Sequence, residues 1–367
     1  MKHAVRVAIL LLLVLSRAGA EEPNELRRKA LAGDRAAQLS LGETYRLGLG
    51  VAPDAAQALL FYQLAAEQNV PEAQFALAEM YRFGEGGAAD YRQAVRWYRR
   101  AAEQGLPEAQ FNLGVMYDNG QGVPQDYQQA VHWYRVTAEK GMADAEFNLG
   151  LMYAAGKGVA RDYQEAARWY RRAADHRGLA EAEYNLGVLY DRGQGVPQSY
   201  QEAARWYRLA AEQGQAEAAF NLGLMHASGE GVKPDYGEAA RWYRQAAEQG
   251  QPEAEYNLGV LYTQGQGVSE DYNQAAKWYR LAAERGQSDA QLNLAALYAA
   301  GRGLAQDYIA AYRWLEIAAA SGASDAAKAK ERISSRLTAA EIQEAQREAA
   351  QWKPCTAKTE CEARFKP

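Results

Sequence analysis

The side chains that could support catalysis or metal binding are few and lie far apart in the sequence. Beyond the N-terminal segment the chain has three histidines, His132, His176 and His226, and two cysteines, Cys355 and Cys361. A metal site needs several such ligands that converge, and a nucleophile needs a base beside it. The carboxylates are numerous but evenly spread. These residues therefore predict no catalytic group, no metal site, no cofactor and no enzyme activity.

One column of asparagines is better suited to binding. It recurs once per period of the sequence, with an apolar residue three positions later. The asparagines are Asn112, Asn148, Asn185, Asn221, Asn257 and Asn293, and the apolar residues are Val115, Leu151, Val188, Leu224, Val260 and Ala296. An amide can both donate to and accept from the backbone of an extended peptide, so the columns predict a partner-binding strip. In the alternative, each asparagine bonds a loop carbonyl of a neighbouring unit and the apolar residues pack between units.

These columns exist because the sequence repeats. A Leu-Gly pair recurs every 36 residues, apart from one step of 37. In two repeats alanine replaces the glycine, at Leu77-Ala78 and Leu294-Ala295. Self-similarity at this period is typical of a solenoid, and 367 residues exceed what a single core usually organises. We therefore expect eight helix-loop-helix repeats over residues 33–322.

Each unit has the signals of two helices joined by a glycine-rich loop. In the third unit Pro107 suits the first turn of the first helix, and Gly120 suits the left-handed conformation that ends it. Gly114 is expected to leave room for a neighbouring backbone, and Asp126 to cap the second helix. The first unit has Asn69 where the others end the second helix with glycine. Asparagine is the next-best residue for a left-handed cap.

The second helices also carry a series of arginines, each with an acid four residues later, as in Arg99 and Glu103. This spacing is most simply a solvated helix face, on which each pair contributes roughly a few tenths of a kcal/mol. A phosphate-binding ladder of arginines is the alternative, but the paired acids would neutralise it.

The N-terminus has the features of a signal peptide. Residues 1–20 combine a positive start, an apolar run from Val7 to Leu15 and a small-x-small site at Ala18-Gly19-Ala20. The run is far shorter than the roughly 20 residues that span a bilayer, so we expect cleavage after Ala20. Residues 21–32 are then expected to cap the first repeat.

The pattern breaks again after residue 322. Lys328 and Lys330 lie where the apolar face should continue, and Thr338 with Glu341 forms a capping box, so residues 323–353 are predicted to be capping helices. In the tail, residues 354–367, two nearby cysteines are expected to close a disulfide in an exported protein. A redox or metal site is the alternative, but no further Cys or His lies near them.

The charge argues against two classes of partner. The chain has 41 basic and 46 acidic residues, and removal of residues 1–20 leaves 38 basic residues and a net charge of −8. A net acidic chain without a basic cluster is a poor candidate for nucleic acid or for an anionic membrane. We expect neither nucleic-acid binding nor membrane insertion after cleavage.

The repeat resembles the Sel1-like repeat, a relative of the tetratricopeptide repeat with a longer loop. The resemblance rests on Ala-x-x-x-Leu-Gly-x-x-Tyr, Gly-x-Gly-Val, the Asp cap and Ala-x-x-Trp-Tyr, and departs from the pattern at Gly87 and His226. It implies an all-α fold, a right-handed α-solenoid with capping helices and a concave binding face. It also implies adaptor, scaffold or regulator roles rather than catalysis.

Together these features predict an exported, non-enzymatic scaffold or regulator that binds an envelope protein or an extended peptide, most simply in a bacterial periplasm. The first alternative is a protein that binds a small ligand, or one that binds or hydrolyses β-lactams as some cysteine-rich secreted proteins of the similar family do. Serine-dependent hydrolysis requires Ser-x-x-Lys and Lys-Thr-Gly motifs, which this sequence lacks: Lys358-Thr359-Glu360 misses the glycine. A protein secreted to engage a host is the second alternative.

Overall fold

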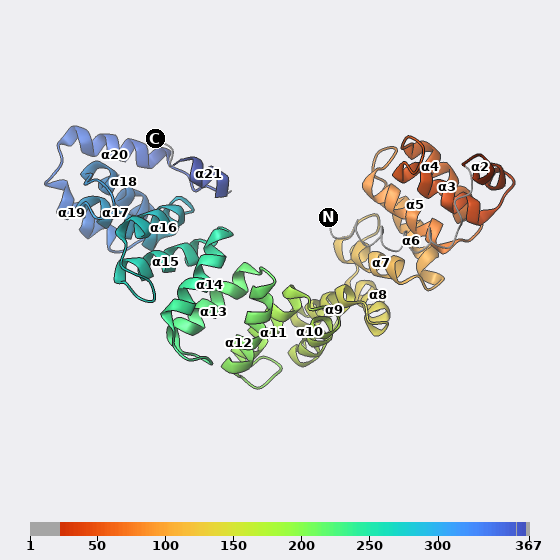
Figure 1. Ribbon diagram of the computed structural model, residues 1–367, viewed down its shortest axis with the longest axis horizontal. Coiled ribbons are helices and arrows are strands. Elements are labelled where there is room, and N and C mark those ends of the chain that lie inside the picture. Colours follow the sequence, from red (N-terminus) through yellow and green to blue (C-terminus); the bar gives the residue numbers. More distant parts are fainter. Residues whose placement is uncertain (1–22, 357, 365–367) are drawn as a thin grey trace. The chain divides into compact units, whose positions relative to one another are not determined.

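The computed structural model describes residues 23–356 and 358–364. The predicted signal peptide lies outside these residues. Within them the secondary structure is helical without a strand, so the predicted all-α repeat fold is confirmed (Figure 1). The chain divides into two compact units between Asp162 and Tyr163, the first built from α2–α9 and the second from α10–α21.

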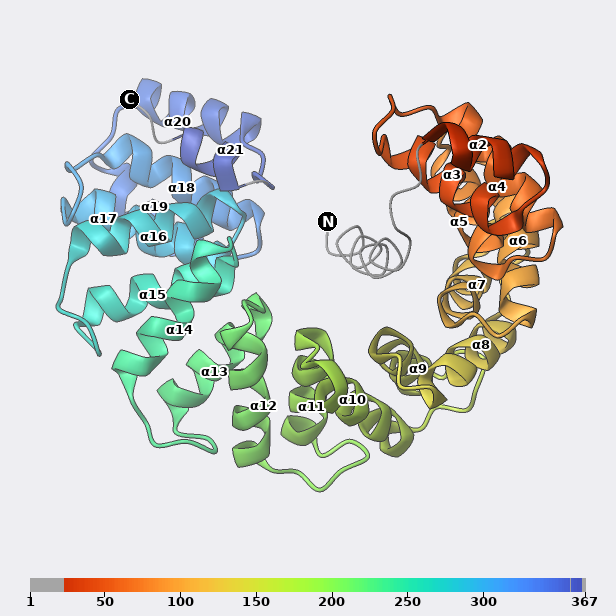
Figure 2. The same cartoon turned by 45° about the vertical axis from the view of Figure 1, so that its right-hand side comes forward.

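Each repeat is a pair of helices, called here its first and second helix (Figure 2). The first helices are α3 (Arg35–Leu47), α5 (Pro71–Phe83), α7 (Pro107–Asn119), α9 (Ala143–Ala155), α11 (Ala180–Arg192), α13 (Ala216–Ser228), α15 (Pro252–Gln264) and α17 (Ser288–Ala300). The second helices are α4 (Ala55–Glu67), α6 (Tyr91–Glu103), α8 (Tyr127–Glu139), α10 (Tyr163–Arg177), α12 (Tyr200–Glu212), α14 (Tyr236–Glu248), α16 (Tyr272–Glu284) and α18 (Tyr308–Ala320). The 37-residue step is accommodated at the end of α10, which has 15 residues where α12 has 13.

The helix ends follow from the residues that the sequence places there. The first helices end at glycines in the left-handed conformation, from Gly48 at φ 72° to Gly301 at φ 65°. Asp126 accepts from two backbone N–H groups at 2.9 and 3.0 Å and so fixes the start of α8. Asn69 has φ 67° and is the non-glycine residue with a positive φ in the described chain. These cap predictions are confirmed.

The third repeat packs around an aromatic side chain of its second helix. Tyr134 is 1% exposed, and Leu113 is completely buried. A Cβ on Gly114 would lie 3.0 Å from the Tyr134 ring, so this glycine makes room for the ring. The expectation that it admits a neighbouring backbone is wrong. In the last repeat Ala295 replaces the glycine, and Leu315 replaces the tyrosine.

From the third repeat onward, the second glycine of the loop meets the backbone of the preceding repeat. A Cβ on Gly231 would lie 2.3 Å from the carbonyl carbon and oxygen of Tyr200, and its φ is +70°. Only glycine combines this conformation with so close an approach. Gly122, Gly158, Gly195, Gly267 and Gly303 have the same surroundings. This glycine therefore fixes how one repeat stacks on the next.

The two ends of the array are closed by helices, as the sequence predicts. In α2 (Pro23–Leu31), Ala30 joins an apolar cluster with Leu41 and Phe61 of the first repeat. At the other end α19 (Ala326–Ser334) and α20 (Ala339–Gln351) pack against α18, and the capping box of Thr338 and Glu341 is present. A short helix, α21 (Lys358–Ala363), follows in the tail.

Candidate functional site

The structure places the predicted partner-binding columns on the first helices. Asn112 is 9% exposed, and the five later asparagines are half-buried. Beside them Leu151 is 38% and Leu224 is 41% exposed, while Val115, Val188 and Val260 are half-buried. Each of the two units thus presents an apolar strip next to its amides.

The asparagines also join successive repeats. The Nδ2 atom of Asn112 lies 3.5 Å from the hydroxyl of Tyr98, on the second helix of the preceding repeat, and 3.0 Å from a carboxylate oxygen of Glu79. The same contact with a tyrosine of the preceding repeat recurs at four later asparagines. The pairs are Asn148 with Tyr134, Asn221 with Tyr207, Asn257 with Tyr243 and Asn293 with Tyr279.

The asparagine column therefore has a structural role, as the alternative interpretation requires. Its partner is a tyrosine hydroxyl, whereas the sequence suggested a loop carbonyl. Burial raises the pKa of Tyr243 to about 12, and the hydrogen bond from Asn257 opposes that rise. The hydroxyl remains protonated at neutral pH, so it can serve as both donor and acceptor. Partner binding by the neighbouring apolar column stays a prediction.

The arginines of the second helices also join repeats. Arg99 donates to the hydroxyl of Tyr117 at 2.8 Å, and Arg135 donates to Tyr153 at 2.7 Å. Arg171, Arg244 and Arg280 make the same bond in later repeats. In the described part of the chain Arg99 forms no ion pair with Glu103, although both side chains are exposed, as expected for a solvated helix face. Each of these arginines bonds a tyrosine of the following repeat, because the stacking of repeats places that tyrosine within its reach. The spacing of residues within one helix does not predict this contact.

The three histidines occupy unrelated places. The ring of His132 lies against Trp133 with centroids 5.0 Å apart, and His176 lies in the last turn of α10. His226 is 7% exposed and occupies the position of the tyrosines that accept from arginine. Burial lowers the pKa of His226. No group of three potential metal-binding side chains gathers within the described residues.

A buried column of amides is a feature that the sequence analysis missed. Gln74 is completely buried, donates to the carbonyl of Ala66 at 3.0 Å and accepts from Gln104 at 2.7 Å. Gln38, Gln110 and Gln291 donate to a carbonyl in the same way. Glutamates take this position at Glu146, Glu183 and Glu255. The recurrence of Gln or Glu at this position was visible in the sequence. The position could not be identified as buried and hydrogen-bonded, because its partners lie on other helices.

We expect Glu183→Gln to stabilise the protein at neutral pH. Glu183 is 4% exposed and accepts from Gln213 at 2.6 Å, and burial raises its pKa. A raised folded-state pKa means that its stability contribution is complete below the unfolded pKa, about 4.3, and is lost as the pH rises through the folded value. Glutamine keeps the acceptor and adds the donor that Gln74 uses.

Urea denaturation between pH 4 and 8 measures this effect. We expect the variant to gain about 1 kcal/mol in unfolding free energy at pH 8, and the gain to disappear towards pH 4. Glu181→Gln, two residues away at an exposed position of the same helix, is the control. A gain that does not depend on pH would show that Glu183 is not buried as a charged group.

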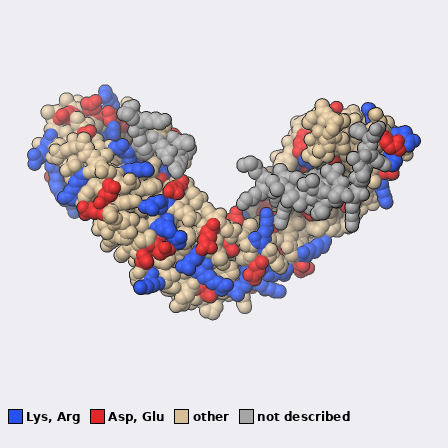
Figure 3. Space-filling model, in the orientation of Figure 1, with Lys and Arg blue, Asp and Glu red and all other residues tan. Residues whose placement is uncertain are grey.

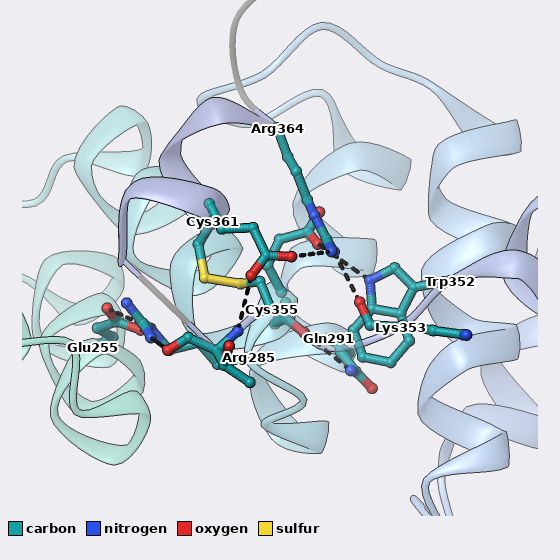
Figure 4. The surroundings of a disulfide bond; sticks show 12 residues. Glu255, Arg285, Gln291, Trp352, Lys353, Cys355, Cys361 and Arg364 are labelled. Carbon is teal, nitrogen blue, oxygen red and sulfur yellow. Dashed lines mark hydrogen bonds and ion pairs between the residues drawn. A yellow bond between two sulfur atoms is a disulfide. The ribbon is translucent and has the colours of Figure 1, made fainter. Parts of the chain in front are cut away.

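The predicted disulfide between Cys355 and Cys361 is present. Its Cα atoms are 5.6 Å apart, and both cysteines are buried, at 4% and 0% exposed. The tail lies against α16, where Cys355 donates its backbone N–H to the carbonyl of Glu284 at 2.9 Å (Figure 4). The tail is therefore an ordered part of the second unit.

A cavity of about 520 Å³ lies beside the last repeat. It is lined by the loop around Leu304, the start of α18 at Tyr308, and Arg336 and Leu337 before α20. In earlier repeats the loop glycine of the next repeat packs on the equivalent tyrosine backbone. The cavity thus marks the place where no ninth repeat follows.

Acidic and basic side chains are interspersed on the face shown in Figure 3. The described helices include none with the length and hydropathy needed to cross a membrane.

Comparison with known proteins identifies the repeat. The family profile described as the Sel1 repeat matches eight times, at residues 35–70, 71–106, 107–142, 143–177, 180–215, 216–251, 252–287 and 288–322. No curated protein sequence matches the chain.

Two solved structures are similar over most of the chain. A Sel1 repeat protein from Oxalobacter formigenes is 34% identical, with a TM-score of 0.68, over 88% of this chain and 93% of that one. A protective antigen of uropathogenic Escherichia coli strains, which displays the same repeat fold, is 29% identical, with a TM-score of 0.57, over 95% of this chain and 98% of that one. The chain belongs to the Sel1 repeat family.

Proposed function

We propose that this protein is an exported, non-enzymatic scaffold or regulator that binds a protein or extended peptide of the cell envelope. Sel1 repeats typically mediate protein–protein interaction, and the eight copies here occupy most of the described chain. The binding surface is the strip of the second unit formed by Val188, Leu224 and Val260 with the adjacent asparagines.

The exposure of the apolar column is the observation that carries this proposal. Leu224 is 41% exposed although its neighbour Leu222 is completely buried in the same helix. Core packing therefore accounts for Leu222 and leaves Leu224 facing outward. Apolar side chains at one position of successive repeats give a regular series of contacts for a partner segment.

The hydrogen bonds beneath the strip support tight binding. Because Asn221 and Asn257 are tied to Tyr207 and Tyr243, the first helices are held in place before a partner arrives. Binding to a preformed surface loses less conformational entropy than binding to a mobile one.

Export is supported by two features outside the strip. The sequence of residues 1–20 has the features of a signal peptide, and a disulfide suits an oxidising compartment. A similar protein is a protective antigen, which fits export of this chain too. Cell fractionation distinguishes periplasmic residence from release into the medium.

In vivo crosslinking followed by affinity capture tests the proposal. The full chain is compared with the double variant Leu224→Asp/Val260→Asp, whose changes lie on α13 and α15. We expect one dominant partner whose recovery falls by roughly tenfold or more in the variant, as for central contacts of an interface. Leu60→Asp, at a 47% exposed leucine of α4, is the control.

Circular dichroism must first show that the three proteins fold equally. Equal capture of the partner by the double variant would place its binding site elsewhere. Capture of no partner by the unmodified chain would contradict the scaffold role.

A further inference from the structure

The C-terminal tail is seated on a defined surface of the seventh repeat. The carboxylate of Glu284 accepts from the indole N–H of Trp352 at 3.1 Å and from Arg364 at 2.7 Å (Figure 4). Glu284 is 8% exposed, and Leu281, one turn earlier in α16, is 3% exposed. Leu281 belongs to the same apolar cluster as both cysteines. The tail therefore recognises a leucine, a carboxylate and the end of a helix.

The fifth repeat has the same surface without a cover. Its segment Arg208-Leu209-Ala210-Ala211-Glu212 is identical to Arg280-Leu281-Ala282-Ala283-Glu284 of the seventh repeat. Leu209 is 36% exposed, and Glu212 is exposed. The glycine that follows each segment shows the same difference between a covered and an open surface. A Cβ on Gly286 would lie 3.6 Å from Pro354, whereas one on Gly214 would have no atom within 4 Å.

The combination of Leu and Glu is confined to three repeats. At the position of Leu209 the other repeats have Arg100, Val136, Arg172, Gln245 and Ile317. The third copy begins at Leu64, which packs against the cluster that contains Ala30 of α2. Terminal elements of the chain thus pack at the first and seventh repeats, and the copy in the fifth repeat remains open.

We propose that Leu209, Glu212 and Gly214 form a docking site for a loop of a partner protein with the chemistry of the tail. Such a loop presents apolar atoms to Leu209 and Gly214, and an indole or guanidinium N–H to the carboxylate of Glu212. Hydrogen bonds from a charged or polar N–H to a carboxylate are short and strong, and carbonyls at a helix end lack partners within the helix. This site lies on a second helix and is separate from the first-helix strip.

The partner is a different protein, because the tail of a second copy binds its own seventh repeat in preference to the fifth repeat of another molecule. Each tail is tethered close to its own seventh repeat, so the local concentration of that site exceeds the concentration of any other copy. A partner loop has no such competing site.

A peptide with the sequence of residues 351–364, closed by its disulfide and labelled at its N-terminus, is the probe. Fluorescence anisotropy follows its binding to the full chain, whose seventh repeat is already occupied by the tail. We expect saturable binding at one site, weakened at least tenfold by Leu209→Ser or by Glu212→Lys. Glu103→Lys, at the equivalent exposed position of the second repeat, should leave binding unchanged because Arg100 replaces the leucine there.

Changes in the peptide test the recognition chemistry separately. Replacement of Trp352 or Arg364 by alanine in the peptide should also weaken binding at least tenfold. Unchanged binding to both fifth-repeat variants, or no saturable binding to the full chain, would overturn the proposal. Self-association of the chain that the peptide abolishes would assign the site to a second copy instead.

Discussion

Gly231→Ala is expected to lower the free energy of unfolding by about 2–5 kcal/mol. The left-handed conformation costs an alanine roughly 1–2 kcal/mol. Its Cβ would in addition lie 2.3 Å from the backbone of Tyr200, and such overpacking costs about 1–3 kcal/mol. The backbone cannot move aside as a flexible side chain would, because Tyr200 begins α12. Urea denaturation followed by circular dichroism measures the loss.

Gly214→Ala separates the two contributions. Gly214 has φ +93°, but a Cβ at this position would have no atom within 4 Å, so the substitution carries the conformational cost without the collision. We expect it to lose about 1–2 kcal/mol. Equal losses at Gly231 and Gly214 would show that the contact between repeats is not the reason for the loop glycine.

The sequence predicted the repeat fold and its caps because those depend on local signals. Asn69 could be assigned a left-handed cap from its position in the alignment of repeats alone, and Asp126 could be assigned as an N-cap in the same way. Both depend on neighbouring backbone atoms.

The contacts between repeats could not be predicted in the same way. Asn112 and Tyr98 lie on different helices, and the amide could equally have faced a loop. The stacking of one repeat on another decides which polar atoms meet, and the period of the sequence does not specify it. The position of the tail on α16 depends on the same packing, so only the pairing of the two cysteines was predictable.

Arg285→Ala is expected to cost about 3–5 kcal/mol, the usual result of removing one partner of a buried ion pair. Glu255 is completely buried, and the side chain of Arg285 is 8% exposed, with 3.3 Å between Arg285 Nε and the carboxylate. The substitution leaves a buried carboxylate without its guanidinium. Arg347→Ala is the control, because Arg347 and Glu344 are 68% and 53% exposed and such pairs contribute about 0–1 kcal/mol.

Substituting both partners tests whether the uncompensated charge causes the loss. Glu255→Gln/Arg285→Gln recreates the neutral pairs of the first two repeats, where Gln68 reaches Gln38 and Gln104 reaches Gln74, each at 2.7 Å. A buried ion pair can often be replaced by a neutral pair without loss, so we expect the double variant to regain most of the stability that Arg285→Ala loses. Arg285 also lies 3.5 Å from the carbonyl of Thr356 in the tail. If the double variant is as unstable as Arg285→Ala, the arginine stabilises the protein through the tail, and the charge of Glu255 is not the cause.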